Sequence, residues 1–477
     1  MSLPATRPAL HLMADTWIND PNGLVHADGV WHAFFQHNPS GPSWGNMSWG
    51  HATSTDLLTW TPQPVALPNT ADHACFSGSA VHDVDDTAGF GAGALVALYT
   101  AAHEPGSPHA GLQTQFVAHS RDHVHFTRSE SPVLDRNSAH FRDPKVVRWQ
   151  GDDEAYWVLA AVEAVDNAVV LYRSDDLQHW TPLSEFRFPG LVSPQWECPD
   201  LFPLEVDGRR RWIMIVSVNP GAIQVGSGTR WFLGDFDGVT FTADEAHPSS
   251  GGDPAWPDGC WLDWGSDNYA SVTFSGVPAT PGGPAGALPR TVMMGWHDNW
   301  DYAFTLADDG FPGMLTVPRE VSWVADDRDP ARAGTLRQWP VRELFDRLGE
   351  QALVKVAGGP GGTFTAPAVG FTALTLTDQQ ELTIGSHRLS WVGDELTLTR
   401  APLPLPSGNE LPAKAVRAPL RPGLTELEVG ILTDHGSLEL FCDGGRTALA
   451  SLALGESGAR PLSWTGTVAR VRVARLS

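Results

Sequence analysis

Ser54-Thr55-Asp56-Leu57-Leu58-Thr59-Trp60 is the first copy of a short pattern that returns at residues 120–126, 174–180 and, in a weaker form, 235–241. Every copy has an aspartate four residues before an aromatic residue. The copies begin at positions 54, 120, 174 and 235, which are 66, 54 and 61 residues apart. A recurrence at this spacing indicates a chain that is built from repeated supersecondary units.

Apolar runs rich in β-forming residues keep the same period, at 31–37, 94–101, 156–162, 211–218 and 291–296. Turn-forming residues bound each run, which is typical of strands. Units of about sixty residues that contain several strands match the blades of a β-propeller better than helical repeats. A β-sandwich with accidental internal similarity is the alternative.

The pattern changes near residue 340. Apolar residues there take the i, i+3, i+4, i+7 spacing of a short helix, at Val341, Leu344, Phe345 and Leu348. A glycine-rich stretch follows at 358–362, and alternating segments then favour an antiparallel sandwich. The sequence therefore predicts an all-β chain with a five-bladed β-propeller at 1–338, a linker with a short helix at 339–362 and a β-sandwich at 363–477.

The composition of the 477 residues excludes several classes of protein. With 42% hydrophobic and 18% charged residues, the chain is globular. Its 55 acidic and 31 basic residues give a formal net charge of -24, which argues against nucleic acid and anionic membranes as partners and favours a neutral substrate. The four cysteines are too scattered for a disulfide scaffold or a CxxC metal site.

The N-terminal residues bear on localisation. No apolar run reaches the roughly 18 residues of a membrane helix. Residues 1–8 contain no apolar core of a signal peptide, so we expect a cytoplasmic protein. A secreted protein whose signal peptide has been removed is the alternative.

Three acidic motifs each precede a different repeat strand. Asp20 lies in Trp-Ile-Asn-Asp-Pro-Asn-Gly at 17–23, Asp143 in Phe-Arg-Asp-Pro at 141–144, and Glu197 in Trp-Glu-Cys-Pro-Asp at 196–200. They stand 11, 13 and 14 residues before the strands that begin at 31, 156 and 211. Taken singly, each motif is also an ordinary turn or surface loop. Their shared register predicts that the three carboxyl groups meet at the mouth of the propeller channel.

Converging carboxylates are the equipment of glycoside hydrolysis. One carboxylate attacks or stabilises the anomeric centre, and another carboxyl group protonates the leaving oxygen. A third could hold ring hydroxyls, and Arg142 could keep its neighbouring carboxylate ionised through its charge.

The three motifs, in this order, resemble the signatures of glycoside hydrolase family 32, which contains the invertases, inulinases and levanases. Further stretches are similar to motifs of the same family, at 44–52, 76–80, 263–270, 295–296, 318–320 and 431–441. The resemblance implies a five-bladed propeller with a sandwich and a retaining double displacement. It departs from the family pattern at 10–16, which lacks the usual glycine before Trp17, and at Asn268, where an aromatic residue is commoner.

The resemblance also assigns roles to residues. It implies that Asp20 is the nucleophile, Glu197 the general acid and base, and Asp143 the residue that stabilises the transition state. A retaining mechanism predicts a separation of roughly 5–5.5 Å between the carboxyl groups of the nucleophile and the acid. The substrate-binding positions that match the family are Trp17, Asn19, Gln36, Trp44, Phe76, Ser77, Arg142, Tyr269 and Trp296. No cofactor and no metal is implied.

The similarity of residues 196–241 to exo-acting fructan hydrolases favours an exo-acting levanase or inulinase with side activity on sucrose. A fructosyltransferase and a disaccharide-releasing fructan enzyme are alternatives with the same catalytic groups. The related arabinanase and xylosidase group, or a carbohydrate-binding propeller without catalysis, would be expected to lack some of these motifs. His123 and His125 alternate on an expected strand but have no evident third metal ligand in the sequence. The sequence does not predict the oligomeric state.

Overall fold

The computed structural model describes residues 6–476 except 223–225, 246, 248–259, 279–286, 326–333, 350–351, 355–359 and 378. This part of the chain is almost entirely β-structure, as predicted, with two short α-helices, Ala303–Asp308 (α1) and Arg342–Leu348 (α2). No helix in it is long and apolar enough to cross a membrane. The first five residues, on which the expectation of a missing signal peptide partly rests, lie outside it.

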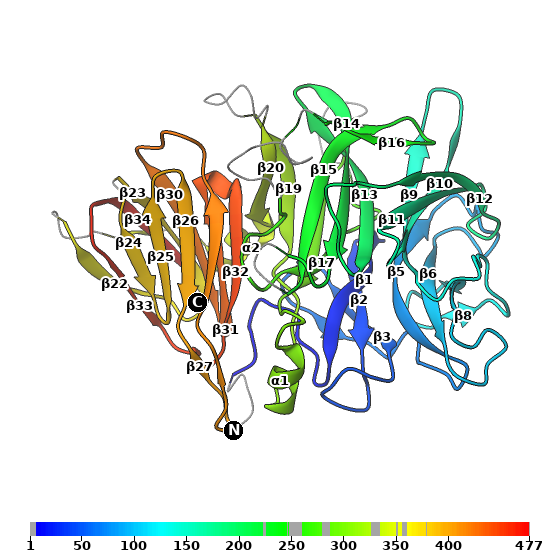
Figure 1. The fold of residues 1–477 in the computed structure, drawn as a ribbon, viewed down its shortest axis with the longest axis horizontal. Coiled ribbons are helices and arrows are strands. Elements are labelled where there is room, and N and C mark those ends of the chain that lie inside the picture. The colour runs from blue at the N-terminus through cyan, green and yellow to red at the C-terminus, as the bar shows by residue number, and fades with distance from the viewer. Residues whose placement is uncertain are drawn as a thin grey trace.

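Five four-stranded antiparallel sheets follow one another along the chain and are the five predicted blades (Figure 1). In each blade the strands pair in sequence order. Blades I to III comprise β1 (Ile18–Ala27), β2 (Val30–His37), β3 (Ser48–Ser54) and β4 (Thr61–Pro62); β5 (His73–Asp83), β6 (Ala94–His103), β7 (Gln113–Ser120) and β8 (Thr127–Arg128); and β9 (Phe141–Gln150), β10 (Ala155–Glu163), β11 (Ala168–Ser174) and β12 (Thr181–Phe186). Blades IV and V comprise β13 (Trp196–Val206), β14 (Arg209–Val218), β15 (Gly228–Phe236) and β16 (Phe241–Ala243); and β17 (Tyr269–Thr273), β18 (Thr291–Trp296), β19 (Arg319–Val324) and β20 (Thr335–Pro340).

The first strands of the blades surround the axis of the propeller. β1, β5, β9, β13 and β17 contact one another in this order, and β17 contacts β1 again. Backbone hydrogen bonds close the ring between blades I and V, from His26 N to the Ser275 carbonyl and from Ser275 N to the Leu24 carbonyl, both 2.9 Å. Side chains at equivalent positions of these strands are thereby brought to one end of the channel.

The repeated sequence pattern is the turn between the third and fourth strands of a blade. One oxygen of Asp56 accepts hydrogen bonds from the backbone N–H groups of Leu58 and Thr59, at 2.9 and 2.6 Å, and Leu57 has a left-handed φ of 63°. The same arrangement occurs at Asp122, Asp176 and Asp237 in blades II to IV. The aspartate recurs because its carboxylate replaces the backbone partners that a tight turn lacks.

Two six-stranded sheets form the C-terminal domain, beside the propeller in Figure 1. The first sheet has the order β21 (Ala352–Val354), β34 (Val468–Arg475), β23 (Gly370–Leu376), β30 (Leu427–Asp434), β31 (Gly436–Cys442) and β32 (Thr447–Ala453). The second has the order β22 (Gly362–Ala366), β33 (Arg460–Trp464), β24 (Glu381–Ile384), β25 (His387–Val392), β26 (Glu395–Arg400) and β29 (Lys414–Pro419). A hairpin of β27 (Leu403–Pro404) and β28 (Glu410–Leu411) and a 3-10 turn, Asp443–Gly445, complete it.

The segment 339–362, expected to be a linker, contains more than the helix α2. β20 of blade V continues to Pro340, and β21 pairs with β34 in the first sheet of the sandwich. The sandwich therefore receives a strand from within this segment. Part of the glycine-rich stretch, 358–359, lies outside the described residues.

A buried ionic network joins the sandwich to blade V. The guanidinium of Arg319 bonds to Glu439 of β31 at 2.9 Å and to Asp263 at 2.7 Å. His11 bonds to Asp434 at 2.8 Å and to Glu439 at 2.9 Å. Burial alone would lower the pKa of His11, but its two carboxylate partners raise it to about 9, so the imidazolium balances their charge.

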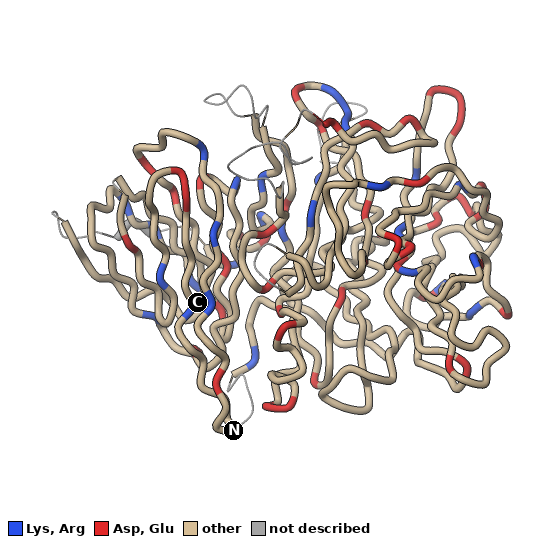
Figure 2. Tube along the Cα trace, viewed as in Figure 1, with Lys and Arg blue, Asp and Glu red and all other residues tan. Residues whose placement is uncertain are grey.

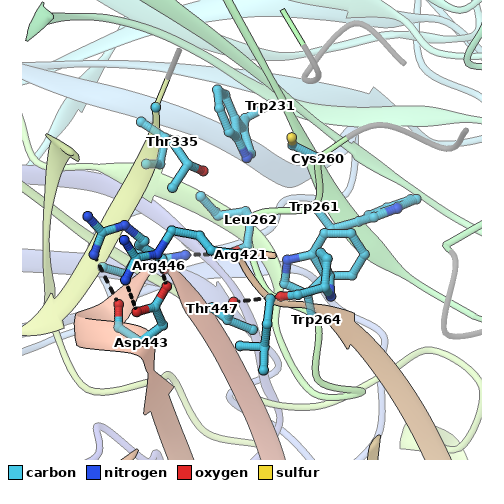
Figure 3. A pocket seen from close by; sticks show the side chains of 15 residues that line it. Trp231, Cys260, Trp261, Leu262, Trp264, Thr335, Arg421, Asp443, Arg446 and Thr447 are labelled. Atoms are coloured by element: carbon cyan, nitrogen blue, oxygen red, sulfur yellow. Dashed lines mark hydrogen bonds and ion pairs between the residues drawn. The ribbon is translucent and has the colours of Figure 1, made fainter. Parts of the chain in front are cut away.

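A cavity of about 80 Å³ lies at the same domain interface (Figure 3). Trp231 of blade IV and Thr335 of blade V face Arg421, Asp443 and Thr447 of the sandwich domain across it. The guanidinium of Arg421 forms an ion pair with the Asp443 carboxylate. None of the predicted site residues lines this cavity.

Acidic residues occur along both domains rather than in one block of the chain (Figure 2). Lys and Arg residues lie among them in both domains.

Candidate active site

Each of the five first strands is interrupted by a β-bulge near its start. The pairing register shifts between Ile18 and Pro21, Phe76 and Gly78, Arg142 and Lys145, Glu197 and Asp200, and Tyr269 and Val272. A proline follows directly in three of them, at 21, 144 and 199, where the missing N–H costs no ladder bond. Bulges of this kind turn side chains out of the regular alternation and are common beside active sites.

Each bulge contributes two consecutive residues, which we call its first and second positions. The first position holds Asn19, Phe76, Arg142, Glu197 and Tyr269, and the second holds Asp20, Ser77, Asp143, Cys198 and Ala270. Asp143, Cys198 and Ala270 have left-handed φ angles of 61°, 44° and 51°, a conformation that side chains other than glycine rarely adopt. The structure therefore brings the three predicted acids to one end of the channel, with Glu197 one position earlier than Asp20 and Asp143.

Asp20 lies at the floor of a pocket at this end of the channel. One carboxylate oxygen accepts a hydrogen bond from Ser77 Oγ at 2.9 Å and lies 3.6 Å from Cys198 Sγ. The other oxygen, Oδ1, is buried and has no hydrogen-bond partner. Burial and the nearby charge of Glu197 raise the pKa of Asp20 to about 6. The hydrogen bond from Ser77 therefore fixes the orientation of this carboxylate in the pocket.

Asp143 lies beside it and is held by the backbone of the next blade. Its carboxylate accepts the N–H of Cys198 at 2.9 Å, and the guanidinium of Arg142 lies 3.9 Å away. Burial raises the pKa of Asp143 to about 7, although the charge of Arg142 opposes this. The Cys198 thiol, whose own pKa burial raises well above its usual value, lies between the carboxylates of Asp20 and Asp143 and can donate its single S–H to either of them.

Glu197 is oriented from two sides. Arg142 donates to one of its oxygens at 3.2 Å, and the hydroxyl of Tyr269 donates to the other. Burial and the charge of Glu197 hold the pKa of Tyr269 well above its usual value, so the phenol keeps its proton. Arg142 also donates to the Gln195 side chain at 3.0 Å, which fixes the guanidinium between Asp143 and Glu197.

The three acids open into a pocket of about 390 Å³, a volume in the range of small-molecule sites. Aromatic side chains line its rim, and two of them are strongly exposed: Trp44 at 44% and Phe304 at 51%. An indole or phenyl face at the entrance is suited to the apolar face of a sugar ring. Besides the three acids and Arg142, the polar lining comes from amides and one hydroxyl, at Asn19, Gln36, Ser77, Gln113, Gln195 and Asn219.

Six of the nine residues predicted to bind substrate line the pocket: Asn19, Gln36, Trp44, Phe76, Ser77 and Arg142. Trp17, Tyr269 and Trp296 are fully buried behind it. Trp17 donates from Nε1 to Asn19 at 2.6 Å and stacks on Phe304, and Trp296 packs against Trp17 and Trp300. These three side chains support the lining from behind and do not form it.

Five lining residues were not predicted: Gln113, Gln195, Asn219, Trp300 and Phe304. Gln195 directly precedes the motif at 196–200, so its place next to a predicted acid could have indicated it. Trp300 and Phe304 lie in the connection that follows β18 and in helix α1, which no repeat position marks.

Two carboxyl groups with separate environments, a third acid beside them and an aromatic rim around a polar pocket define a glycoside hydrolase on a propeller scaffold. Comparisons with known proteins agree. Residues 11–340 match the family model for the N-terminal domain of glycosyl hydrolases family 32.

Relatives of this family cover most of the chain. A levanase from Bacillus subtilis is 33% identical over 509 residues, which cover 99% of this chain and 70% of the levanase. An invertase from Wickerhamomyces anomalus is 35% identical over 366 residues, covering 72% of this chain and 62% of the invertase. The crystal structure of an exo-inulinase from Aspergillus awamori superposes with a TM-score of 0.84 at 29% identity, covering 99% of this chain and 98% of the inulinase.

The chain belongs to glycoside hydrolase family 32. It is a β-fructofuranosidase of the kind that its sequence motifs predicted, built as a propeller and a sandwich. The arabinanase-like alternative does not match this family assignment.

Proposed function

We propose that the protein is an exo-acting fructan hydrolase, which releases fructose from the end of a levan or inulin chain and also cleaves sucrose. The observation that carries the proposal is the meeting of Asp20, Asp143 and Glu197 in one pocket with an aromatic entrance. Similarity to a levanase along nearly the whole chain and to an exo-inulinase structure supports a fructan over sucrose as the main substrate.

In the first step, the carboxylate of Asp20 attacks the anomeric carbon of the terminal fructosyl unit. The bond from that carbon to the glycosidic oxygen breaks, and Glu197 gives its proton to the leaving oxygen. The hydrogen bond from Ser77 Oγ holds the Asp20 carboxylate in a fixed orientation for this attack. Asp143 accepts hydrogen bonds from the fructose hydroxyls, which strengthen as positive charge develops on the ring.

In the second step, Glu197 takes a proton from water, and the water oxygen attacks the same carbon. The ester bond to Asp20 breaks, and fructose leaves with its original configuration. Arg142 and Tyr269 hold Glu197 in place for both proton transfers. The retaining gap of 5–5.5 Å between the carboxyl groups of Asp20 and Glu197 stays a prediction.

The products of levan, inulin and sucrose over time test this function. An exo-hydrolase releases fructose alone from either polymer from the first minutes, with the chain length falling slowly. Disaccharides or longer oligomers as the first products would instead indicate disaccharide release or internal cleavage. Kestose-type oligomers formed at high sucrose would indicate fructosyl transfer.

The pH dependence of kcat/KM reports the ionisation of Asp20. Because protonated Asp20 cannot attack, we expect activity to fall as the pH drops through about 6. Ser77→Ala removes a hydrogen bond to the anion, and about 1.5 kcal/mol for such a bond corresponds to about one pH unit. The acidic limb of the variant should therefore lie at higher pH. Ser77→Thr keeps the hydroxyl and should keep the limb of the wild type, and a limb that does not move in Ser77→Ala would contradict the assignment.

The aromatic rim should matter more for fructans than for sucrose. Phe304→Ala removes an exposed ring from the entrance, and an aromatic contact of about 0.5–1.5 kcal/mol predicts a KM for inulin raised roughly 2- to 12-fold. We expect kcat to change less than about twofold, since the ring takes no part in the proton transfers or in the attack. Val392→Ala, which alters an exposed residue of the sandwich, serves as the control. Equal effects on sucrose and inulin would argue against a rim that binds the polymer.

A further inference from the structure

We propose that Asp28, His82 and His123 bind one divalent transition-metal ion where blades I and II meet. Asp28 is in the turn between β1 and β2, His82 is near the end of β5, and His123 is in the turn between β7 and β8. These positions lie toward the opposite end of the first strands from the catalytic acids. Asp28 is eight residues beyond Asp20, which is up to roughly 26 Å along an extended strand.

The three side chains offer one ligand atom each, and all these atoms lie within 4.8 Å of one another. His82 Nε2 is 4.0 Å from the Asp28 carboxylate, too far for a hydrogen bond. That nitrogen is buried and has no hydrogen-bond partner. A buried nitrogen without a partner carries a desolvation cost, which a metal bond would remove.

The spacing is close to that of a coordination sphere. Ligands at about 2.1 Å from a tetrahedral zinc ion are about 3.4 Å apart. Closing the gap requires side-chain shifts of about 1 Å, and Asp28 is free to make them because 74% of its side chain is exposed. Its exposure also leaves room for water as a fourth ligand.

The backbone around the three ligands is rigid. Asp28 and Gly29 form a two-residue turn with positive φ angles of 50° and 82°. His123 occupies the left-handed position of the repeated aspartate turn, with a φ of 63°. Its ring is held by a hydrogen bond from Nε2 to the Gly93 carbonyl at 2.9 Å, and it packs edge-on against His82. Ligands fixed by tight turns and a strand lose little freedom on binding.

The donor set identifies the class of ion. Two imidazoles and one carboxylate are typical of zinc and its neighbours in the first transition row, and Mg²⁺ and Ca²⁺ prefer oxygen ligands alone. His125, the other histidine of the repeat turn, is not part of the group and pairs with Asp122 at 2.8 Å. The other two ligands could not be recognised from the sequence, because Asp28 and His82 belong to other segments and are distant from His123 along the chain. The bound ion would tie blade I to blade II.

Zinc binding to the full chain tests the proposal. After treatment with a chelator, the wild type should take up one tightly bound Zn²⁺ per chain in equilibrium dialysis. His82→Gln and His123→Gln should each weaken this binding by about tenfold or more, because each removes a ligand. His125→Gln is the matched control and should bind as the wild type does.

Two further measurements keep the test independent of folding. Asp28→Asn changes an exposed residue, so it should fold normally, hydrolyse sucrose like the wild type and still lose affinity for zinc. Co²⁺ in place of Zn²⁺ should give the visible absorption of a four-coordinate ion in the wild type, and His82→Gln should lose it. Equal binding by the wild type and His82→Gln, or no saturable uptake at all, would overturn the proposal.

Discussion

Asp20→Asn is expected to lower kcat on sucrose by about 10⁴-fold or more, which corresponds to about 5 kcal/mol of transition-state stabilisation. An amide has nearly the shape of the carboxylate and can still accept the hydrogen bond from Ser77 Oγ. It cannot form the covalent bond to the anomeric carbon, so the two-step route is lost. Initial rates at saturating sucrose measure the effect.

The same variant should be more stable than the wild type at neutral pH. Burial and the charge of Glu197 raise the pKa of Asp20 to about 6 from a usual 3.8, so the ionised group destabilises the fold above about pH 6. The corresponding free energy is at most about 3 kcal/mol and vanishes below pH 4, where the group is protonated in both states. A raised melting temperature with lost activity would separate catalysis from misfolding. If Asp20→Asn retained more than a hundredth of the wild-type activity, Asp20 would be excluded as the nucleophile.

Arg319→Ala is expected to destabilise the protein by about 3–5 kcal/mol, because it leaves the buried carboxylates of Glu439 and Asp263 without their shared cation. His11 remains beside Glu439, but among the described residues no other cation forms an ion pair with Asp263. The midpoint of the first unfolding transition in urea measures the loss.

The control for this variant is Arg388, an exposed arginine of the sandwich domain. Arg388→Ala removes an ion pair with Glu381, and the Arg388 side chain is 54% exposed. Exposed ion pairs contribute about 0–1 kcal/mol to the free energy of unfolding. Arg319→Lys retains the charge without the planar fork and should fall between the two. An Arg319→Ala variant as stable as Arg388→Ala would show that the network does not hold the domains together.

The repeat could be recognised from the sequence because the turn it forms has a local cause. Asp56 and its counterparts bond to the backbone only two and three residues ahead, so each copy keeps its pattern whatever surrounds it. The three acids could be predicted for a similar reason, since each lies at a bulge at the start of a first strand. The position of Glu197, one residue earlier in its bulge than Asp20 and Asp143, could not be predicted. A bulge changes the alternation of side chains along a strand without changing the spacing between motifs.

Other parts of the site depend on contacts between distant segments. Trp300 and Phe304 reach the pocket from a connection whose course is set by packing on Trp17 and Trp296. The motifs at 263–270 and 318–320 resemble family stretches, but Asp263 and Arg319 bond across the interface to the sandwich. Sequence similarity singled out these stretches, but it did not indicate that the partners of Asp263 and Arg319 belong to the other domain.

The five bulges have a consequence for how such a protein can acquire new chemistry. They present ten side chains around one axis, two from each blade. Ser77 and Ala270 occupy the same kind of site as Asp20 and Asp143. One reactive side chain can thus be replaced by another at a single bulge, while the strands that set the spacing around the axis stay the same.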